Sequence, residues 1–98
     1  MSNQKLTIIA KILAKPEKKK LVKSELLKLI DVTRAENGCI NYDSHQNNEN
    51  ENLFLFYENW ESRELWQIHM NNTHLAGFMK ATDEAVEEFT LKKVIHIE

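Results

Sequence analysis

The segment Leu53–Trp60, LFLFYENW, constrains the fold of this chain more than any other stretch. Side chains alternate between the two sides of a strand, and here both sides are mainly apolar. One side holds Phe54, Phe56, Glu58 and Trp60, and the other holds Leu53, Leu55 and Tyr57. Such a strand belongs in a sheet that is covered on both faces.

Three further segments are expected to pair with this strand. Cys39–Gln46 alternates less cleanly, and the polar turn Asn47–Asn52 joins it to Leu53–Trp60 as a hairpin. Leu6–Leu13 is rich in β-branched residues and is apolar on both sides. Phe89–Ile97 alternates and is expected to be the final strand.

Three-residue and four-residue spacing of apolar residues predicts the helices. A first helix is expected over 17–36, with Pro16 in its first turn and Asn37–Gly38 ending it. Its buried stripe is Val22, Leu26, Leu29, Ile30 and Thr33. Ser62 is expected to cap a second helix, which breaks at Asn71–Asn72, and Thr73 to cap a third. The third helix would bury Leu75, Phe78, Met79, Thr82, Ala85 and Val86.

This order of elements is strand, helix, strand, strand, helix pair, strand. It predicts one α+β domain over residues 1–98, with a ferredoxin-like four-stranded antiparallel sheet and helices on one face. The strands nevertheless supply apolar side chains to both faces, and a monomer seldom leaves such a face in water. We therefore expect a homodimer in which the open face packs on the same face of a second copy.

Composition excludes several classes of protein. The 13 Lys and Arg against 15 Asp and Glu give a net charge of −2, which does not favour nucleic acid as a partner. No apolar run approaches the roughly 20 residues of a membrane-spanning helix, so we expect no membrane association. The single cysteine, Cys39, cannot form an internal disulfide, and the chain does not open on a signal-peptide pattern, so a cytoplasmic location is expected.

The candidate functional residues lie between Glu58 and His74. Trp60 sits where a strand gives way to a helix, and its ring either packs in the core or lines a pocket. His69 is either a packed helix histidine or a catalyst, and the helix start at His74 favours the neutral imidazole that a general base needs. Glu58 shares a strand side with aromatic rings, so it must be paired with a cation, protonated, or orienting a histidine. Tyr42 could donate a hydrogen bond into the same cleft.

Other kinds of site fit the sequence less well. The two glycines, Gly38 and Gly77, are too far apart to form a phosphate-binding loop. His69 and His74 are five residues apart across a helix break, unlike the four-residue spacing of a zinc-binding helix. A metal held by both histidines and Glu58 is conceivable, but we expect no metal and no other cofactor.

The pattern Glu58-x-Trp60-Glu61-Ser62, followed by His69 and His74, resembles the antibiotic biosynthesis monooxygenase family, especially its small quinol-monooxygenase-like members. The turn Glu36-x-Gly38-Cys39-x-x-Tyr42 and the opening LTIIAKILAKPEKK resemble the same family. The resemblance therefore extends over nearly the whole chain.

This resemblance implies a dimeric α+β barrel and cofactor-independent oxygenation of a quinol or polyphenol by molecular oxygen. The catalytic residues would be His74, His69 and Trp60, and the substrate-binding residues would be Glu58, Phe56, Tyr42 and Phe78. Which histidine acts as the base stays open.

Three alternatives also remain. One is a proton-shuttling isomerase of a small carbonyl compound, and another is a dimer that binds small ligands without catalysis. Haem degradation is the third and is disfavoured, because haem-degrading relatives place an asparagine on the first strand and LTIIAKIL has none.

Overall fold

The computed structural model describes residues 5–95 and 97 of the 98-residue chain. In chain order the elements are β1 (Leu6–Ala14), the short 3-10 helix η1 (Pro16–Lys18), α1 (Lys19–Arg34), β2 (Cys39–Gln46), β3 (Leu53–Trp60), α2 (Arg63–Met70), α3 (Thr73–Ala81) and β4 (Val86–Val94). The predicted order of elements and the ferredoxin-like α+β fold are confirmed, and β2 and β3 have the predicted bounds.

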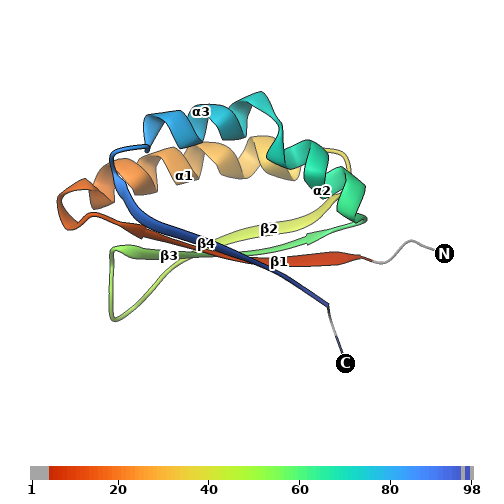
Figure 1. The fold of residues 1–98 in the computed structure, drawn as a ribbon, viewed down its shortest axis with the longest axis horizontal. Coiled ribbons are helices and arrows are strands. Elements are labelled where there is room, and N and C mark those ends of the chain that lie inside the picture. Colours follow the sequence, from red (N-terminus) through yellow and green to blue (C-terminus); the bar gives the residue numbers. More distant parts are fainter. Residues whose placement is uncertain (1–4, 96, 98) are drawn as a thin grey trace.

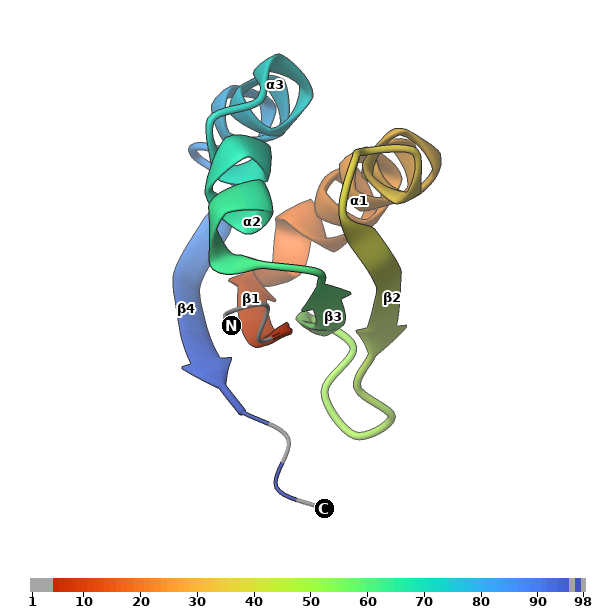
Figure 2. The ribbon, with the colours of Figure 1, turned by 90° about the vertical axis from the view of Figure 1, so that its right-hand side faces the viewer.

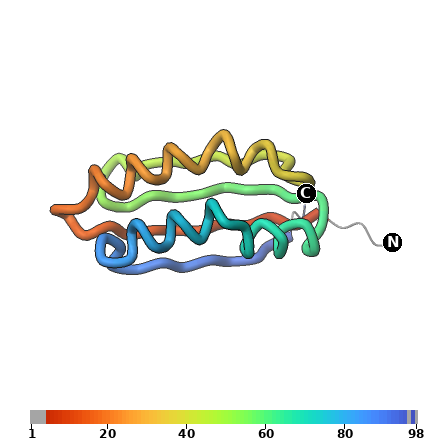
Figure 3. The backbone as a smooth tube through the Cα atoms, turned by 90° about the horizontal axis from the view of Figure 1, so that it is seen from above, coloured from red at the N-terminus to blue at the C-terminus, as the bar shows by residue number. Residues whose placement is uncertain are grey.

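The four strands form one antiparallel sheet in the order β2-β3-β1-β4. All the helices lie over the same face of this sheet (Figure 1). Viewed along the strands, α1 lies over the β2 and β3 half, while α2 and α3 lie over the β1 and β4 half (Figure 2). From above, α1 and α3 run side by side (Figure 3). The central strands β1 and β3 thus lie under the junction of the helices.

The core fills the space between the helices and the covered face of the sheet. Alternation places every second residue of β1 and β3 in this layer, where paired residues such as Ile8 and Glu58 share one side of the sheet. In this layer the buried residues of β1 and β3 are Leu6, Ile8, Ala10, Ile12, Ala14, Phe54, Phe56, Glu58 and Trp60, and β2 adds Tyr42. The helices contribute Val22, Leu26, Leu29, Thr33, Trp66, His69 and Phe78. The predicted stripe of the first helix is therefore buried, apart from the half-buried Ile30.

The helix ends differ slightly from the prediction. The α1 helix ends at Arg34, two residues early, because the turn that precedes Gly38 already begins at Ala35. Ser62 caps α2 as predicted, with its hydroxyl oxygen accepting from the Leu65 N–H at 3.2 Å. Asn72, not Thr73, caps α3 and accepts from the His74 N–H at 3.2 Å. No helix within residues 5–95 is long and apolar enough to span a membrane.

The final strand begins three residues earlier than predicted. Val86, expected on the third helix, pairs with Ala14 of β1. The strand ends at Val94, which forms the last pair with β1, at Thr7. The prediction also placed Ile95, His96 and Ile97 in the strand, but Ile95 and Ile97 lie beyond its end and His96 is outside the described residues.

The face of the sheet opposite the helices is partly apolar and uncovered. Ile9 pairs with Tyr57 on this face, and the two are 39% and 47% exposed. Leu13, Leu53 and Leu55 are half-buried on the same side. At one end of the face, Thr7 donates to Asn59, and Asn59 donates to Asn41 at 2.9 Å.

Candidate active site

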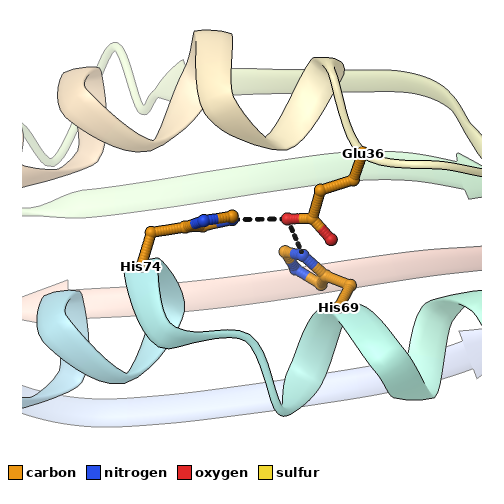
Figure 4. Close-up of side chains that lie close together, drawn as sticks. All are labelled: Glu36, His69 and His74. Carbon is orange, nitrogen blue, oxygen red and sulfur yellow. Dashed lines mark hydrogen bonds and ion pairs between the residues drawn. The ribbon is translucent and has the colours of Figure 1, made fainter.

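One carboxylate joins the two candidate histidines. Glu36 Oε2 accepts from His69 Nδ1–H at 3.0 Å and from His74 Nε2–H at 2.5 Å (Figure 4). The His69 side chain is 3% exposed, Glu36 is 10% exposed and His74 is 27% exposed. An ionised carboxylate can only accept hydrogen bonds, so each imidazole presents an N–H to Glu36, and a ring in its neutral form has its lone pair on the other nitrogen. The Glu36 carboxylate therefore sets which nitrogen of each ring carries the hydrogen that faces it.

The turn after α1 holds Glu36 in place. The Glu36 N–H donates to the Thr33 carbonyl at 3.0 Å, and the Glu36 carbonyl accepts from the Cys39 N–H at 3.2 Å. Gly38 has a φ of 91°, a left-handed conformation that glycine adopts without strain. Its carbonyl accepts from the Glu61 N–H at 2.8 Å, which ties the turn to the segment that enters α2.

The break between α2 and α3 brings the two histidines to the same carboxylate. His69 lies in the last turn of α2, and His74 is the second residue of α3. Between them, the Asn72 N–H donates to the His69 carbonyl at 3.0 Å, while the Asn72 side chain caps α3. On one continuous helix, residues five apart would not face each other. The break is thus what allows both rings to reach Glu36.

Trp60 supports His69 from the sheet side. The two ring centroids are 4.7 Å apart, and Trp60 is completely buried. The Trp60 indole N–H donates to Glu58 Oε1 at 3.0 Å. Burial raises the pKa of Glu58 to about 7, although this hydrogen bond lowers it in part. No Lys or Arg in the described part of the chain forms an ion pair with Glu58, so it is held by an indole in a poorly hydrated site.

A cavity of about 120 Å³ lies beside this cluster, between the sheet and the helices. Among the described residues, the polar side chains that line it are Tyr42, Glu58 and His69. The remaining lining residues are Ala10, Ile12, Leu29, Phe56, Met70, Leu75, Ala76, Phe78, Met79, Phe89 and Leu91. An apolar cavity with a few converging polar groups is the usual form of a small-molecule site.

Burial also sets the protonation of Tyr42 and Cys39. Burial, followed by the charge of Glu58, raises the pKa of Tyr42, so its hydroxyl remains a hydrogen-bond donor at neutral pH. Tyr42 stacks on Phe56 with ring centroids 5.7 Å apart, and its ring meets the edge of His69 at 6.1 Å. Burial, followed by Glu58 and Glu36, raises the pKa of Cys39 to about 11, which leaves an unreactive thiol.

The structure divides the predicted site residues into two groups. His69, Glu58, Phe56, Tyr42 and Phe78 line the cavity. Trp60 lies behind His69, and His74 lies on the far side of Glu36; neither is a lining residue.

Glu36 was absent from the predicted site. It lies 33 residues before His69, so no spacing rule connects the two. In the sequence, only its place in the Glu36-x-Gly38-Cys39 turn, which resembles the family, pointed to Glu36 as a site residue.

The fold and this site define a class: a small α+β protein with a histidine and carboxylate cluster beside an apolar cavity. Residues 5–81 match the family model for antibiotic biosynthesis monooxygenase. The chain therefore belongs to the antibiotic biosynthesis monooxygenase family.

Individual relatives agree with this family. The chain is 32% identical over 74 residues to "Putative monooxygenase YcnE" of Bacillus subtilis, which covers 76% of this chain and 78% of that protein. It is 28% identical over 79 residues to "Putative monooxygenase Rv0793" of Mycobacterium tuberculosis, covering 81% and 77%. The crystal structure of PA3566 from Pseudomonas aeruginosa has a TM-score of 0.93 and 30% identity, covering 100% of this chain and 98% of that one.

Proposed function

We propose that this protein is a cofactor-independent monooxygenase that acts on a single-ring quinol or polyphenol, with His69 as the general base. The observation that carries the proposal is that His69 lines an apolar cavity while its Nδ1–H is held by Glu36. Membership of the family and the names of the two relatives support monooxygenase chemistry. The quinol substrate and the role of His69 are our inference.

The proposed reaction starts with removal of a proton. With Nδ1–H donated to Glu36, the Nε2 lone pair of His69 takes the proton of a substrate hydroxyl, and Glu36 stabilises the imidazolium that forms. The electron-rich quinolate then transfers an electron to O₂, and the two radicals combine at a ring carbon. One oxygen atom enters the ring and the other leaves as water. The substrate supplies all four electrons, so a quinol gives a hydroxylated quinone.

The other residues of the cluster have distinct proposed roles. His74 is a positioning residue, because its N–H donates to the same oxygen of Glu36 and fixes the carboxylate toward His69. Tyr42 and Glu58 contact substrate hydroxyl groups, and Phe56 and Phe78 pack against the ring. Trp60 holds Glu58 and His69 from behind rather than stacking on the substrate.

The size of the cavity sets the substrate class. An apolar cavity of about 150 Å³ engineered in another protein binds benzene, and the cavity of about 120 Å³ is of the same order. A single aromatic ring therefore fits this cavity better than a fused-ring quinol or a haem. The apolar lining also keeps bulk water away from the reduced oxygen intermediates.

Oxygen consumption tests this proposal. A panel of single-ring and two-ring hydroquinones is supplied to wild type and to His69→Ala, Glu36→Gln and His45→Ala. His45 lies exposed on β2, away from the cluster, so His45→Ala is the matched control. Loss of a general base typically costs about 10²–10⁴-fold in rate, and His69→Ala should lose that much. Uptake by wild type no faster than spontaneous oxidation, or full activity in His69→Ala, would refute the proposal.

A proton-shuttling isomerase of a small carbonyl compound is a second candidate. It is favoured by one observation: Glu58, with a pKa of about 7, and His69 line the same cavity and could act as acid and base on one substrate. Turnover of a small ketone or dione without oxygen would support the isomerase. Ligand-induced quenching of tryptophan fluorescence without turnover in either assay would instead indicate a binding protein.

We further infer that the protein is a homodimer joined through the open face of the sheet. This face carries the exposed pair Ile9 and Tyr57 and the half-buried leucines at 13, 53 and 55. The helices cover only the other face, and a second sheet is a natural packing partner for a partly apolar sheet face.

A further inference from the structure

Glu36, His69 and His74 present three metal-ligating atoms at one place. Glu36 Oε2, His69 Nδ1 and His74 Nε2 all lie within 4.8 Å of one another. The oxygen sits between the two nitrogens, at 3.0 and 2.5 Å (Figure 4). Three separate segments of the chain supply these atoms: the turn after α1, the end of α2 and the start of α3.

From this arrangement we propose that the three residues bind a divalent transition-metal ion of the zinc class. Metal–ligand bonds of about 2.0–2.1 Å in a tetrahedral site hold the ligand atoms about 3.3 Å apart. Oε2 lies 3.0 and 2.5 Å from the two nitrogens and all three atoms lie within 4.8 Å of one another, so side-chain rotations that move Oε2 outward would admit the ion. Two imidazoles and one carboxylate occur together in catalytic zinc sites, with water in the fourth position.

The type of ligand determines which ions would bind. Imidazole nitrogen suits Zn²⁺, Co²⁺, Ni²⁺ and Cu²⁺, whereas Mg²⁺ and Ca²⁺ prefer an all-oxygen shell. The half-exposed His74 gives an ion access from solvent. The sequence suggested Glu58 as the third ligand of such a site, but Glu58 is engaged with the Trp60 indole and Glu36 takes that place.

The scaffold already holds the ligands in position. The Gly38 carbonyl accepts from the Glu61 N–H at 2.8 Å and joins the turn that carries Glu36 to the entry of α2. Asn72 joins the end of α2 to the start of α3 through its backbone N–H and its side chain. A pre-organised site loses less conformational entropy when the ion binds.

Metal binding and the proposed base catalysis exclude each other. An ion on Nδ1 of His69 forces the proton of a neutral ring onto Nε2, so the lone pair that would take the substrate proton is lost. The metal site itself depends only on the three side chains and does not require oxygenase activity. Binding measurements can therefore fail or succeed independently of the oxygen-uptake assay.

Isothermal titration of chelator-treated, untagged protein with ZnCl₂ tests the site. We expect saturable binding of one ion per chain to wild type, and none of MgCl₂. Loss of even a second-sphere partner costs about tenfold or more in metal affinity, so Glu36→Gln and His74→Ala should each weaken binding by at least about tenfold. His45→Ala and Cys39→Ala are the controls and should bind as wild type does. The proposal is overturned if wild type shows no saturable Zn²⁺ binding, or if Glu36→Gln and His74→Ala bind Zn²⁺ as tightly as wild type does.

A second measurement uses the wild-type chain alone and does not depend on the folding of any variant. The imidazole Cε1–H resonances of His69 and His74 should shift on addition of ZnCl₂, while that of His45 stays in place. Shifts confined to His45 would show binding at another site and would overturn the assignment.

Discussion

Phe56 and Tyr57 are neighbours in β3, yet Phe56 is 5% exposed and Tyr57 is 47% exposed. Phe56 points to the face under the helices, where it lines the cavity and stacks with Tyr42. Tyr57 points to the open face, beside Ile9. Two rings of similar size thus have different surroundings within one chain. The sheet therefore carries apolar side chains on both faces, and the helices of the chain cover only one of them.

The polar side chains of the two faces also differ in their burial and in their hydrogen bonds. Under the helices, Glu58 is buried, and within the described residues its carboxylate has one hydrogen bond, which it accepts from Trp60. On the open face, Thr7, Asn59 and Asn41 form a chain of hydrogen bonds from strand to strand. On the covered face, desolvation therefore disfavours the ionised form of Glu58. On the open face the polar side chains bond to one another, and Asn41 Nδ2 also donates to the Asp43 carboxylate at 3.1 Å.

The largest effect should come from removing the ring on the covered face. Phe56→Ala should lower the free energy of unfolding by about 3–5 kcal/mol, because it removes buried area and leaves a hole beside the existing cavity. Urea denaturation followed by circular dichroism measures the change. A loss below about 1 kcal/mol would mean that this layer repacks freely, and the contrast with Tyr57 would then disappear.

Glu58→Gln should have an intermediate effect that depends on pH. The pKa of Glu58 is raised to about 7 from an ordinary 4.5, so the folded state favours the protonated form and wild type loses stability as pH rises from about 5 to 8. The glutamine keeps an acceptor for Trp60 and does not ionise. The stability of Glu58→Gln relative to wild type should therefore rise by about 2–3 kcal/mol over this range.

Thermal melting of both proteins at several pH values measures this difference. Glu84→Gln, at an exposed glutamate in the turn before β4, is the control and should follow wild type at every pH. A constant difference between Glu58→Gln and wild type would show that Glu58 is not desolvated in solution.

Removal of the Tyr57 ring from the open face should have the smallest effect on the free energy of unfolding of a single chain. Tyr57→Ala should change it by less than about 1 kcal/mol in a dilute, monomeric sample. The same substitution should weaken the proposed dimer at least about tenfold, because aromatic residues near the centre of an interface dominate its affinity. Sedimentation velocity over a range of concentrations measures the dimer.

Ile68→Ala provides the control for this experiment. Ile68 is 62% exposed, but it lies on α2, away from the open face, so its loss should not affect association. A wild-type chain that remains monomeric at high concentration would contradict the proposed dimer directly.

The fold was largely predictable because its signals are local. The alternation of Leu53–Trp60, the spacing of Val22, Leu26 and Leu29, and the Ser62 cap each depend on residues within one or two turns of chain. The errors occurred where a distant partner decides the outcome. The start of β4 at Val86 is set by pairing with Ala14 across the sheet, although local spacing continues the helical stripe to that residue.

The site was predictable in part for the same reason. His69 and His74 could be placed near Trp60 because all three lie within fifteen residues of one another. Glu36 could not, because its approach depends on how the end of α1 packs against the break between α2 and α3. Which of the predicted residues would line the cavity also depended on tertiary packing, so Trp60 and Phe56 could not be distinguished from their strand positions alone.

Gly38 has a consequence for how this site can vary. A Cβ at this position would lie 2.4 Å from Cδ1 of Leu65 on α2, in addition to the strain of its positive φ. Any larger residue would therefore act as a wedge between the turn bearing Glu36 and the helix bearing His69. The spacing of Glu36 and His69 therefore depends on the absence of a side chain at Gly38. A substitution at Gly38 is thus expected to separate Glu36 from His69 while it leaves both side chains unchanged.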